Sequence, residues 1–224
     1  MSSIIINPID GTVFDADGLE LIGTDGFNAL EGTKLGDYIE ARGAGDFIDA
    51  ASGDDLIDGG MGGDLIHAGN GDDSVLGGGG NDIIFAGKGE DVILGGEGND
   101  AIFGGSGDDY LLGGDGDDSI FGSKGDDTIR GGIGNDLLFG NSGSDEFEFT
   151  NEDLDPRFIA RIGDFQLDQD RIVLKGLDED SQVSFNGGTG HITLNGNPVI
   201  ALEDINSSEE LEMDFNEDGD FEIM

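Results

Sequence analysis

The chain has 224 residues, with 9 Lys and Arg against 51 Asp and Glu, and its formal net charge is −42. A nucleic-acid-binding protein needs basic residues to neutralise phosphates, so this class is excluded, and binding to an anionic membrane surface is disfavoured for the same reason. The absence of Cys excludes disulfide scaffolds and thiolate metal sites, and no apolar run approaches the ~18–20 residues of a membrane span. With 35% hydrophobic residues, this charge predicts a chain that is either disordered or folds when cations neutralise its carboxylates.

Residues 1–22 contain three short apolar segments and no Lys or Arg. The segments Ile4–Ile6, Val13–Phe14 and Leu19–Ile22 have the length of short strands. The first of them is too short to be the core of a secretory signal. We therefore expect residues 1–22 to form an N-terminal β cap.

Residues 23–148 consist of fourteen tandem nonapeptides without an insertion or deletion. If the positions are numbered 1 to 9, position 6 is Asp in thirteen repeats and position 8 is apolar in all fourteen, while position 4 is Gly in the eleven consecutive repeats from Gly53 to Gly143. The repeats at 32–49 are degenerate, because Leu35 and Ala44 stand at position 4. A flexible glycine-rich linker would have no reason to place an apolar residue at every ninth position.

This pattern resembles the calcium-binding nonapeptide of the RTX family, G-G-x-G-x-D-x-U-x. The resemblance implies an all-β parallel β-roll, a β-solenoid with two nonapeptides per coil and about seven coils. It also implies that Ca²⁺ lies between stacked turns, held by position-6 carboxylates and by backbone carbonyls of the turn glycines.

The physical chemistry of the repeat agrees with this fold. Glycine and acidic residues at positions 1–6 favour tight turns, and positions 7–9 predict a very short strand whose position-8 side chain points into a thin core. With two nonapeptides per coil, turns of every second repeat stack, which places Asp73 beside Asp91 and Asp82 beside Asp100. Neighbouring carboxylates repel unless a cation lies between them, and ligands that are all oxygens suit Ca²⁺.

Eleven repeats, at 50–148, combine Gly at position 4 with Asp at position 6, and pairing each with the next but one predicts about nine Ca²⁺ ions. Asp37 and Asp46 lie in degenerate repeats. The pattern favours neither calcium ligands nor solvated turn carboxylates at these two positions. The candidate carboxylate ligands are Asp55, Asp64, Asp73, Asp82, Asp91, Asp100, Asp109, Asp118, Asp127, Asp136 and Asp145. The candidate carbonyl ligands belong to Gly53, Gly62, Gly71, Gly80, Gly89, Gly98, Gly107, Gly116, Gly125 and Gly134.

Residues 149–224 depart from the repeat, and we expect a C-terminal β cap here. The segments Ile162–Phe165 and Asp170–Leu174 are similar to the region after the β-roll in RTX proteins such as the serralysin proteases. Four basic residues would hold this cap to the acidic roll: Arg157, Arg161, Arg171 and Lys175. Asn195-Gly196 predicts a hairpin between Ile192–Leu194 and Val199–Ile200.

The tail carries two short motifs. Asp214–Gly219 matches the first half of a D-x-N-x-D-G calcium loop, but the chain ends before the acid that would complete it, which favours an ordinary acidic turn. Residues 220–224 resemble the uncleaved C-terminal signal of type I export.

Little in the sequence indicates catalysis. There is no H-E-x-x-H motif, so the resemblance to serralysins does not extend to their protease domain, and His67 and His191 fall at predicted surface positions. We therefore expect a calcium-binding protein that is not an enzyme, folds on binding Ca²⁺, and is secreted or held at the cell surface without a cleavable N-terminal signal. Two alternatives remain: a module that binds acidic polysaccharide, resembling the non-catalytic modules of alginate epimerases, and an enzyme with its site in 149–224.

One outward row of position-9 residues is aromatic. Phe85, Phe103, Phe121 and Phe139 occupy this position in every second repeat and predict a ladder on one face of the roll. Such a ladder is either a row of ordinary β-formers or a surface that packs on a second copy or on the C-terminal cap.

Overall fold

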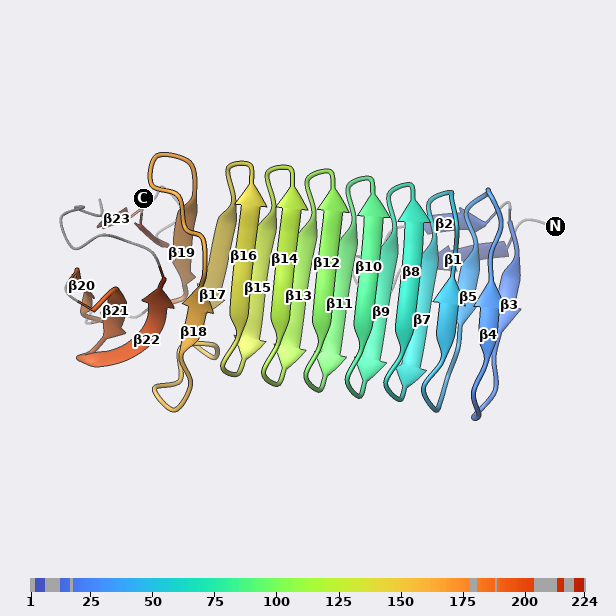
Figure 1. Cartoon of the computed structure of the whole chain (residues 1–224), viewed down its shortest axis with the longest axis horizontal. Helices are drawn as coiled ribbons and strands as arrows, with labels where there is room; N and C mark the ends of the chain where they lie inside the picture. The colour runs from blue at the N-terminus through green and yellow to red at the C-terminus, as the bar shows by residue number, and fades with distance from the viewer. Residues whose placement is uncertain are drawn as a thin grey trace.

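The computed structural model describes residues 3–6, 13–16, 18–177, 181–187, 189–203, 213–215 and 220–223. The chain winds into a parallel β-solenoid in which successive strands alternate between two facing sheets (Figure 1). Each coil takes two nonapeptides, so that Ile84 is in register with Ile102, and Ile102 with Ile120. The prediction of an all-β roll with two nonapeptides per coil and about seven coils is confirmed.

Within the described residues, the first long sheet, sheet 1, contains eleven strands, of which those from β3 to β19 are parallel neighbours. In spatial order they are β3 (Glu20–Ile22), β5 (Tyr38–Glu40), β7 (Leu56–Met61), β9 (Ser74–Gly79), β11 (Val92–Glu97), β13 (Tyr110–Asp115), β15 (Thr128–Ile133), β17 (Glu146–Thr150), β19 (Arg171–Lys175), β24 (Phe221–Ile223) and β23 (Met213–Phe215).

Sheet 2 also has eleven strands in the part of the chain that the structure describes, and it faces sheet 1 across the core. In spatial order they are β4 (Ala29–Glu31), β6 (Phe47–Asp49), β8 (Leu65–Asn70), β10 (Ile83–Lys88), β12 (Ala101–Ser106), β14 (Ser119–Lys124), β16 (Leu137–Ser142), β18 (Ala160–Ile162), β22 (Asn197–Leu202), β21 (His191–Leu194) and β20 (Val183–Asn186). Near the N-terminus, β1 (Ser3–Ile6) and β2 (Val13–Ala16) form a separate antiparallel pair. The described part of the chain contains no helix that could cross a membrane.

The core is a row of position-8 side chains from both sheets. From Ile39 to Phe147 every one of them is fully buried, as the spacing of the repeat predicts. A second inward row, not foreseen, comes from position 1, where Ala41, Ala50, Ala68 and Ala86 are also fully buried. Because strand residues alternate between faces, positions 8 and 1 point inward while positions 7 and 9 point outward.

The strands of the regular coils are longer than predicted. They span six residues, from position 7 through position 3 of the next repeat, where only positions 7–9 were expected. Parallel pairing continues through the glycines, since Gly87 is in register with Gly105 and Lys88 with Ser106. The turns are therefore reduced to positions 4–6, which brings the position-6 Asp directly against the start of the next strand.

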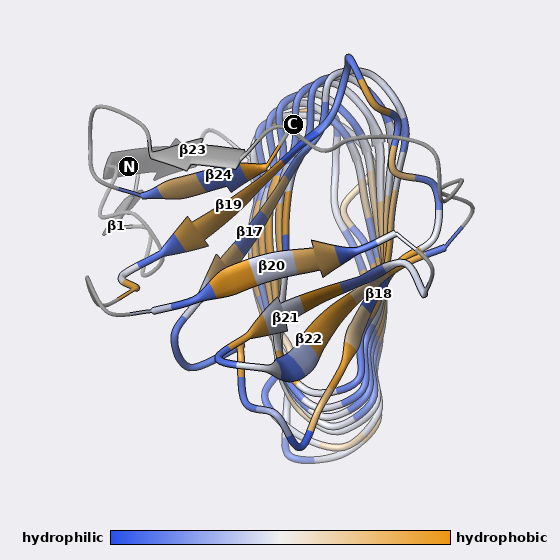
Figure 2. Ribbon diagram, turned by 90° about the vertical axis from the view of Figure 1, so that its left-hand side faces the viewer, coloured by the Kyte–Doolittle hydropathy of each residue, from blue (hydrophilic) through white to orange (hydrophobic). Residues whose placement is uncertain are grey.

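The C-terminal strands lie across the end of the roll (Figure 2). Strand β18 continues sheet 2 beside β16, β22 pairs in parallel with β18, and β24 covers β19 in antiparallel orientation. Ile192, Ile200 and Ile223 are fully buried here. The predicted hairpin is confirmed, because β21 and β22 pair antiparallel around Asn195 and Gly196, both with positive φ. The division into a cap at 1–22, a roll at 23–148 and a cap at 149–224 stays a prediction.

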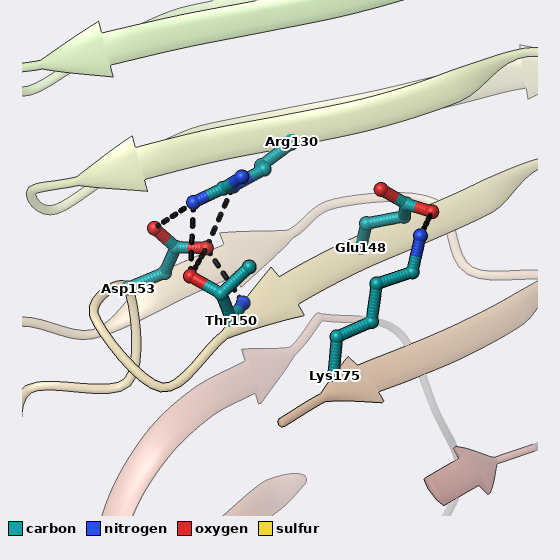
Figure 3. Close-up of polar contacts among 5 residues, drawn as sticks. All are labelled: Arg130, Glu148, Thr150, Asp153 and Lys175. Carbon is teal, nitrogen blue, oxygen red and sulfur yellow. Dashed lines mark hydrogen bonds and ion pairs between the residues drawn. The ribbon is translucent and has the colours of Figure 1, made fainter. Parts of the chain in front are cut away.

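Charged contacts join the last coils to the segment after them (Figure 3). The Arg130 guanidinium donates to both carboxylate oxygens of the buried Asp153, at 2.8 and 3.0 Å, and to the Thr150 hydroxyl at 2.9 Å. Lys175 on β19 pairs with Glu148 on β17. These contacts fix the turn after β17 and the strand beside it.

The basic residues predicted to hold the cap divide into two kinds. Lys175 and Arg171 do contact acids of the roll, since Arg171 pairs with Glu146. Arg157 instead pairs with Asp155 two residues away, because both lie in the same exposed loop. Arg130, a position-9 residue within the repeats, was not foreseen as an anchor.

Candidate calcium-binding turns

Two rows of turns run along the roll, one on each side. We call the turns that lead from sheet 2 to sheet 1 edge A and those that lead from sheet 1 to sheet 2 edge B. Along each edge the position-6 aspartates of every second repeat stack, and the backbone N–H of one Asp donates to Oδ1 of the Asp in the next coil. For example, Asp82 donates to Asp100 and Asp100 to Asp118, each at 2.8 Å. This ladder confirms the predicted stacking of like turns.

The second oxygen of these carboxylates has no partner. Twelve Oδ2 atoms, those of every position-6 Asp from Asp46 to Asp145, are buried and accept no hydrogen bond in the described structure. All these residues are at most 3% exposed. Leaving a buried polar group unpaired costs about 1–3 kcal/mol, and more for a charged group, so twelve in one chain indicate a missing positive partner.

Eight of these oxygens lie beside the glycine at position 1 of their own repeat, and the other four repeats have Ala at that position. A Cβ added at Gly95 would lie 2.5 Å from Oδ2 of Asp100 and 2.6 Å from the carbonyl oxygen of Gly113 in the next coil. A carboxylate oxygen and a backbone carbonyl oxygen thus approach the same small space. Position 1 is Gly or Ala in all fourteen repeats, a signal in the sequence that could have located this space.

The position-4 glycines allow the turns to stack closely. A Cβ on Gly98 would lie 1.8 Å from the carbonyl oxygen of Gly80, and one on Gly116 would lie 1.9 Å from that of Gly98. The candidate glycines also have positive φ, between 113° and 138°, except Gly134. Their carbonyl oxygens therefore lie between successive turns, which is where the family resemblance places carbonyl ligands.

Burial disfavours the ionised form of these carboxylates when no counter-ion is bound. Desolvation raises the pKa of Asp55 to about 7, of Asp109 to about 8 and of Asp73 to about 9. The hydrogen bond from the preceding Asp in the stack lowers the pKa in each case, and neighbouring carboxylates raise it further. Near neutral pH the folded turns need either protons or a cation.

The chemistry of the donor set fits Ca²⁺. Among the described residues, no group of three or more His, Cys, Asp or Glu side chains converges on one point. A cation in these turns must therefore take part of its shell from the backbone. Ca²⁺ accepts six to eight oxygen ligands in flexible geometry and combines carboxylates with backbone carbonyls.

The degenerate repeats behave differently from each other. Asp46 has an orphaned Oδ2 like the regular repeats. Both oxygens of Asp37 are hydrogen-bonded, since Oδ2 accepts the Thr33 N–H at 2.5 Å and Oδ1 accepts the N–H of Leu19. The sequence pattern does not separate the two residues, because both repeats lack Gly at position 4.

Asp170 is a further member of the edge A ladder that the repeat pattern did not reveal. Its Oδ1 accepts the N–H of Asp145 at 3.1 Å, and its Oδ2 accepts the Gln166 N–H at 2.7 Å. Asp145 and Asp170 are 25 residues apart in sequence, whereas Asp127 and Asp145 are 18 residues apart. A search for Asp at a fixed spacing therefore does not find Asp170. Most of the motif at Asp214–Gly219 lies outside the described residues.

The fold and the rows of turns define a parallel β-roll of the calcium-binding class. The sequence model of the RTX calcium-binding nonapeptide repeat, in four copies, matches at residues 31–66, 40–75, 58–93, 76–111 and 112–147. Together these matches cover 31–147, just over half of the chain. The chain belongs to the RTX calcium-binding nonapeptide repeat family. A search of curated proteins found no significant match.

Only the RTX repeat domain is found, and no catalytic domain is identified. A groove that binds acidic polysaccharide would need basic side chains, and the candidates in the C-terminal region are Arg157, Arg161, Arg171 and Lys175. Arg157 pairs with Asp155, Arg171 with Glu146 and Lys175 with Glu148. The charge of these three basic side chains is therefore already neutralised. This arrangement gives no support to a basic groove.

The predicted aromatic row is an outward ladder on sheet 2. The rings of Phe85, Phe103, Phe121 and Phe139 stack with centroids 4.9–5.1 Å apart and planes within 9° of parallel. His67 extends the row, 5.0 Å from Phe85. At the other end the backbone of Gly163 packs on Phe139, since a Cβ there would lie 2.2 Å from the ring. The segment after the repeats thus contacts the last ring of the ladder.

Proposed function

We propose that this protein is a multi-site calcium-binding β-roll whose folding is coupled to Ca²⁺ binding. The observation that carries the proposal is the set of twelve buried Oδ2 atoms without a hydrogen-bond partner. In this proposal the position-6 carboxylates from Asp55 to Asp145 and the carbonyls of the position-4 glycines hold ions between stacked turns, about nine in all. The bound charge offsets the repulsion that a net charge of −42 imposes on a compact chain.

A titration followed by far-UV circular dichroism tests this function. Without calcium at neutral pH the spectrum should be that of a disordered chain, and Ca²⁺ should produce a cooperative gain of β signal. We expect affinities of extracellular modules, about 10⁻⁴–10⁻³ M per site. Mg²⁺ at equal concentration should do much less, because it prefers a strict octahedral shell and retains its water. A full β signal in calcium-free buffer at neutral pH would contradict the proposal.

We also propose that the chain acts outside the cell as a binding or structural module. RTX repeats are typical of secreted proteins. Calcium outside cells reaches the concentration that such sites need, whereas the cytosol would leave the chain unfolded. Expression with and without a type I transporter checks this: the chain should reach the medium only with the transporter, and equal amounts in both cultures would contradict it.

A further inference from the structure

The backbone at position 2 differs between turns with and without an orphaned oxygen. In all twelve repeats whose Asp has a partnerless Oδ2, the residue at position 2 has positive φ, from 69° to 125°. In order these residues are Arg42, Ala51, Gly60, Gly69, Gly78, Gly87, Gly96, Gly105, Gly114, Ser123, Gly132 and Asn141. Four of them are not glycine, so the conformation belongs to the turn and not to one residue type.

Three further turns have the opposite arrangement. The residues that correspond to position 2 are Thr24, Thr33 and Gln166, and none of them has positive φ. The N–H of each donates to the side chain four residues later: Thr24 to Asn28 at 3.2 Å, Thr33 to Asp37 at 2.5 Å and Gln166 to Asp170 at 2.7 Å. We call these turns closed and the twelve others open.

Position 4 does not make this distinction. Asp168, at the position-4 place of its turn, has a φ of 72°, yet Asp170 is closed. Gly134 lacks a φ in the positive range, yet Asp136 is open. Of these two positions, only position 2 has a φ that separates the open turns from the closed ones.

The physical reason is that the position-2 N–H and a cation compete for the same carboxylate oxygen, Oδ2. At negative φ the position-2 N–H points at the carboxylate and presents the positive end of its dipole where a cation would bind. At positive φ the N–H points elsewhere, and the buried oxygen has no donor. A closed turn therefore satisfies its carboxylate within the chain, whereas an open turn needs an external positive charge.

We propose that the sign of φ at position 2 determines which turns bind calcium, so that Asp46 is a ligand while Asp37 and Asp170 are calcium-free ends of the edge A ladder. This inference rests on the proposed function. The open turns comprise six aspartates on each edge, which leaves five gaps per edge and ten ions. If only repeats 50–148 bound calcium, the count would be nine ions. If Asp37 and Asp170 bound calcium in addition to the open turns, the count would be twelve ions.

A matched pair of variants at Arg42 tests the rule. Arg42 has a φ of 80°, and its exposed side chain pairs with the half-buried Glu40. Arg42→Gly and Arg42→Thr both remove this ion pair, but glycine accepts positive φ freely and a β-branched residue strongly disfavours it. Native mass spectrometry in calcium should show ten ions for wild type and for Arg42→Gly, and nine for Arg42→Thr. Circular dichroism should show that both variants remain folded.

Asp170→Asn supplies the second measurement, because it keeps the size of the side chain and removes its charge. It should bind ten ions, like wild type. Ten ions in Arg42→Thr would overturn the rule at position 2, and the loss of an ion in Asp170→Asn would overturn its assignment as a closed turn. A wild-type chain that binds no calcium would instead contradict the proposed function itself.

Discussion

At the scale of single residues, each stacked aspartate uses its two oxygens differently. Oδ1 of Asp100 accepts the N–H of Asp82 and holds the register of the stack, while Oδ2 faces the space beside Gly95 without a donor. One side chain therefore contributes both to the fold and to the candidate site. For this reason a substitution should affect calcium binding and folding together.

Asp100→Ala should weaken two central sites, those shared with Asp82 and with Asp118. At a calcium concentration ten- to a hundredfold above the dissociation constant, the loss of two ions lowers the free energy of unfolding by about 3–5 kcal/mol. The measurement is chemical denaturation in calcium together with an ion count.

Two control variants accompany Asp100→Ala. Asp115→Ala, an exposed change of equal charge, should have little effect. Asp37→Ala should lose hydrogen bonds worth about 1–2 kcal/mol but no ion. Equal loss of ions at Asp37 and Asp100 would contradict the model of stacked sites.

Acid should partly replace calcium. Burial raises the pKa of Asp82 to about 7 and of Asp118 to about 8 in the fold, well above that of an exposed Asp. The calcium-free fold therefore binds more protons than the unfolded chain. Its stability is greatest below about pH 4 and is lost as the pH rises through the folded-state values of about 6 to 9.

Circular dichroism in calcium-depleted buffer checks this dependence. We expect β signal to appear as the pH falls from 8 to 5, and the calcium concentration needed for folding to fall over the same range, because protons neutralise part of the buried carboxylates. A calcium-free chain that is equally disordered at pH 8 and pH 5 would show that burial of these carboxylates is not what opposes folding.

At the scale of the strands, the two sheets present different outer faces. Strands β8, β10, β12, β14 and β16 contain no Asp or Glu, although the chain carries 51 of them. They carry the stacked rings instead. On a protein of this charge, an acid-free apolar face is the surface where a second copy can approach with least repulsion.

Phe103→Ser combined with Phe121→Ser should therefore abolish self-association in calcium while the calcium-induced β signal persists. The matched control is Leu94→Ser combined with Leu112→Ser, which alters the same outward position on sheet 1. Sedimentation velocity distinguishes the two double variants. If the wild-type chain remains monomeric at high concentration, the ladder is only a row of residues that favour β-strands and not a surface for self-association.

At the scale of the whole molecule, a solenoid exposes its core wherever it ends. Phe147 and Phe149 on β17 are buried against residues that come after the repeats, and Arg130 anchors the turn at Asp153. Removal of 149–224 would expose this end of the core and leave Asp145 without its partner Asp170. Stacked repeats depend on such terminal elements for solubility and stability.

A chain truncated after residue 148 should fold only at higher calcium concentration, or not at all. A chain truncated after residue 203 keeps β18, β19 and the hairpin of β21 and β22, and it should lie closer to wild type. Calcium titrations of the two truncations provide the test. Equal midpoints for wild type and the shorter chain would show that the C-terminal strands do not stabilise the roll.

The sequence by itself determined the period of the roll, its buried position-8 row and the stacking of Asp from every second repeat, because each of these depends only on a repeat without insertions. Only the tertiary structure decided which turns are open, that is, which carboxylates have an Oδ2 without a hydrogen-bond donor. Asp37 and Asp46 look alike in sequence. Thr33 nevertheless donates its N–H to Oδ2 of Asp37, while Arg42, at positive φ, leaves Oδ2 of Asp46 without a donor. Asp170 joins the ladder only after an irregular segment displaces it from the repeat spacing. A backbone torsion and a contact across such an insertion depend on how the coils pack, so neither appears in a fixed-period pattern.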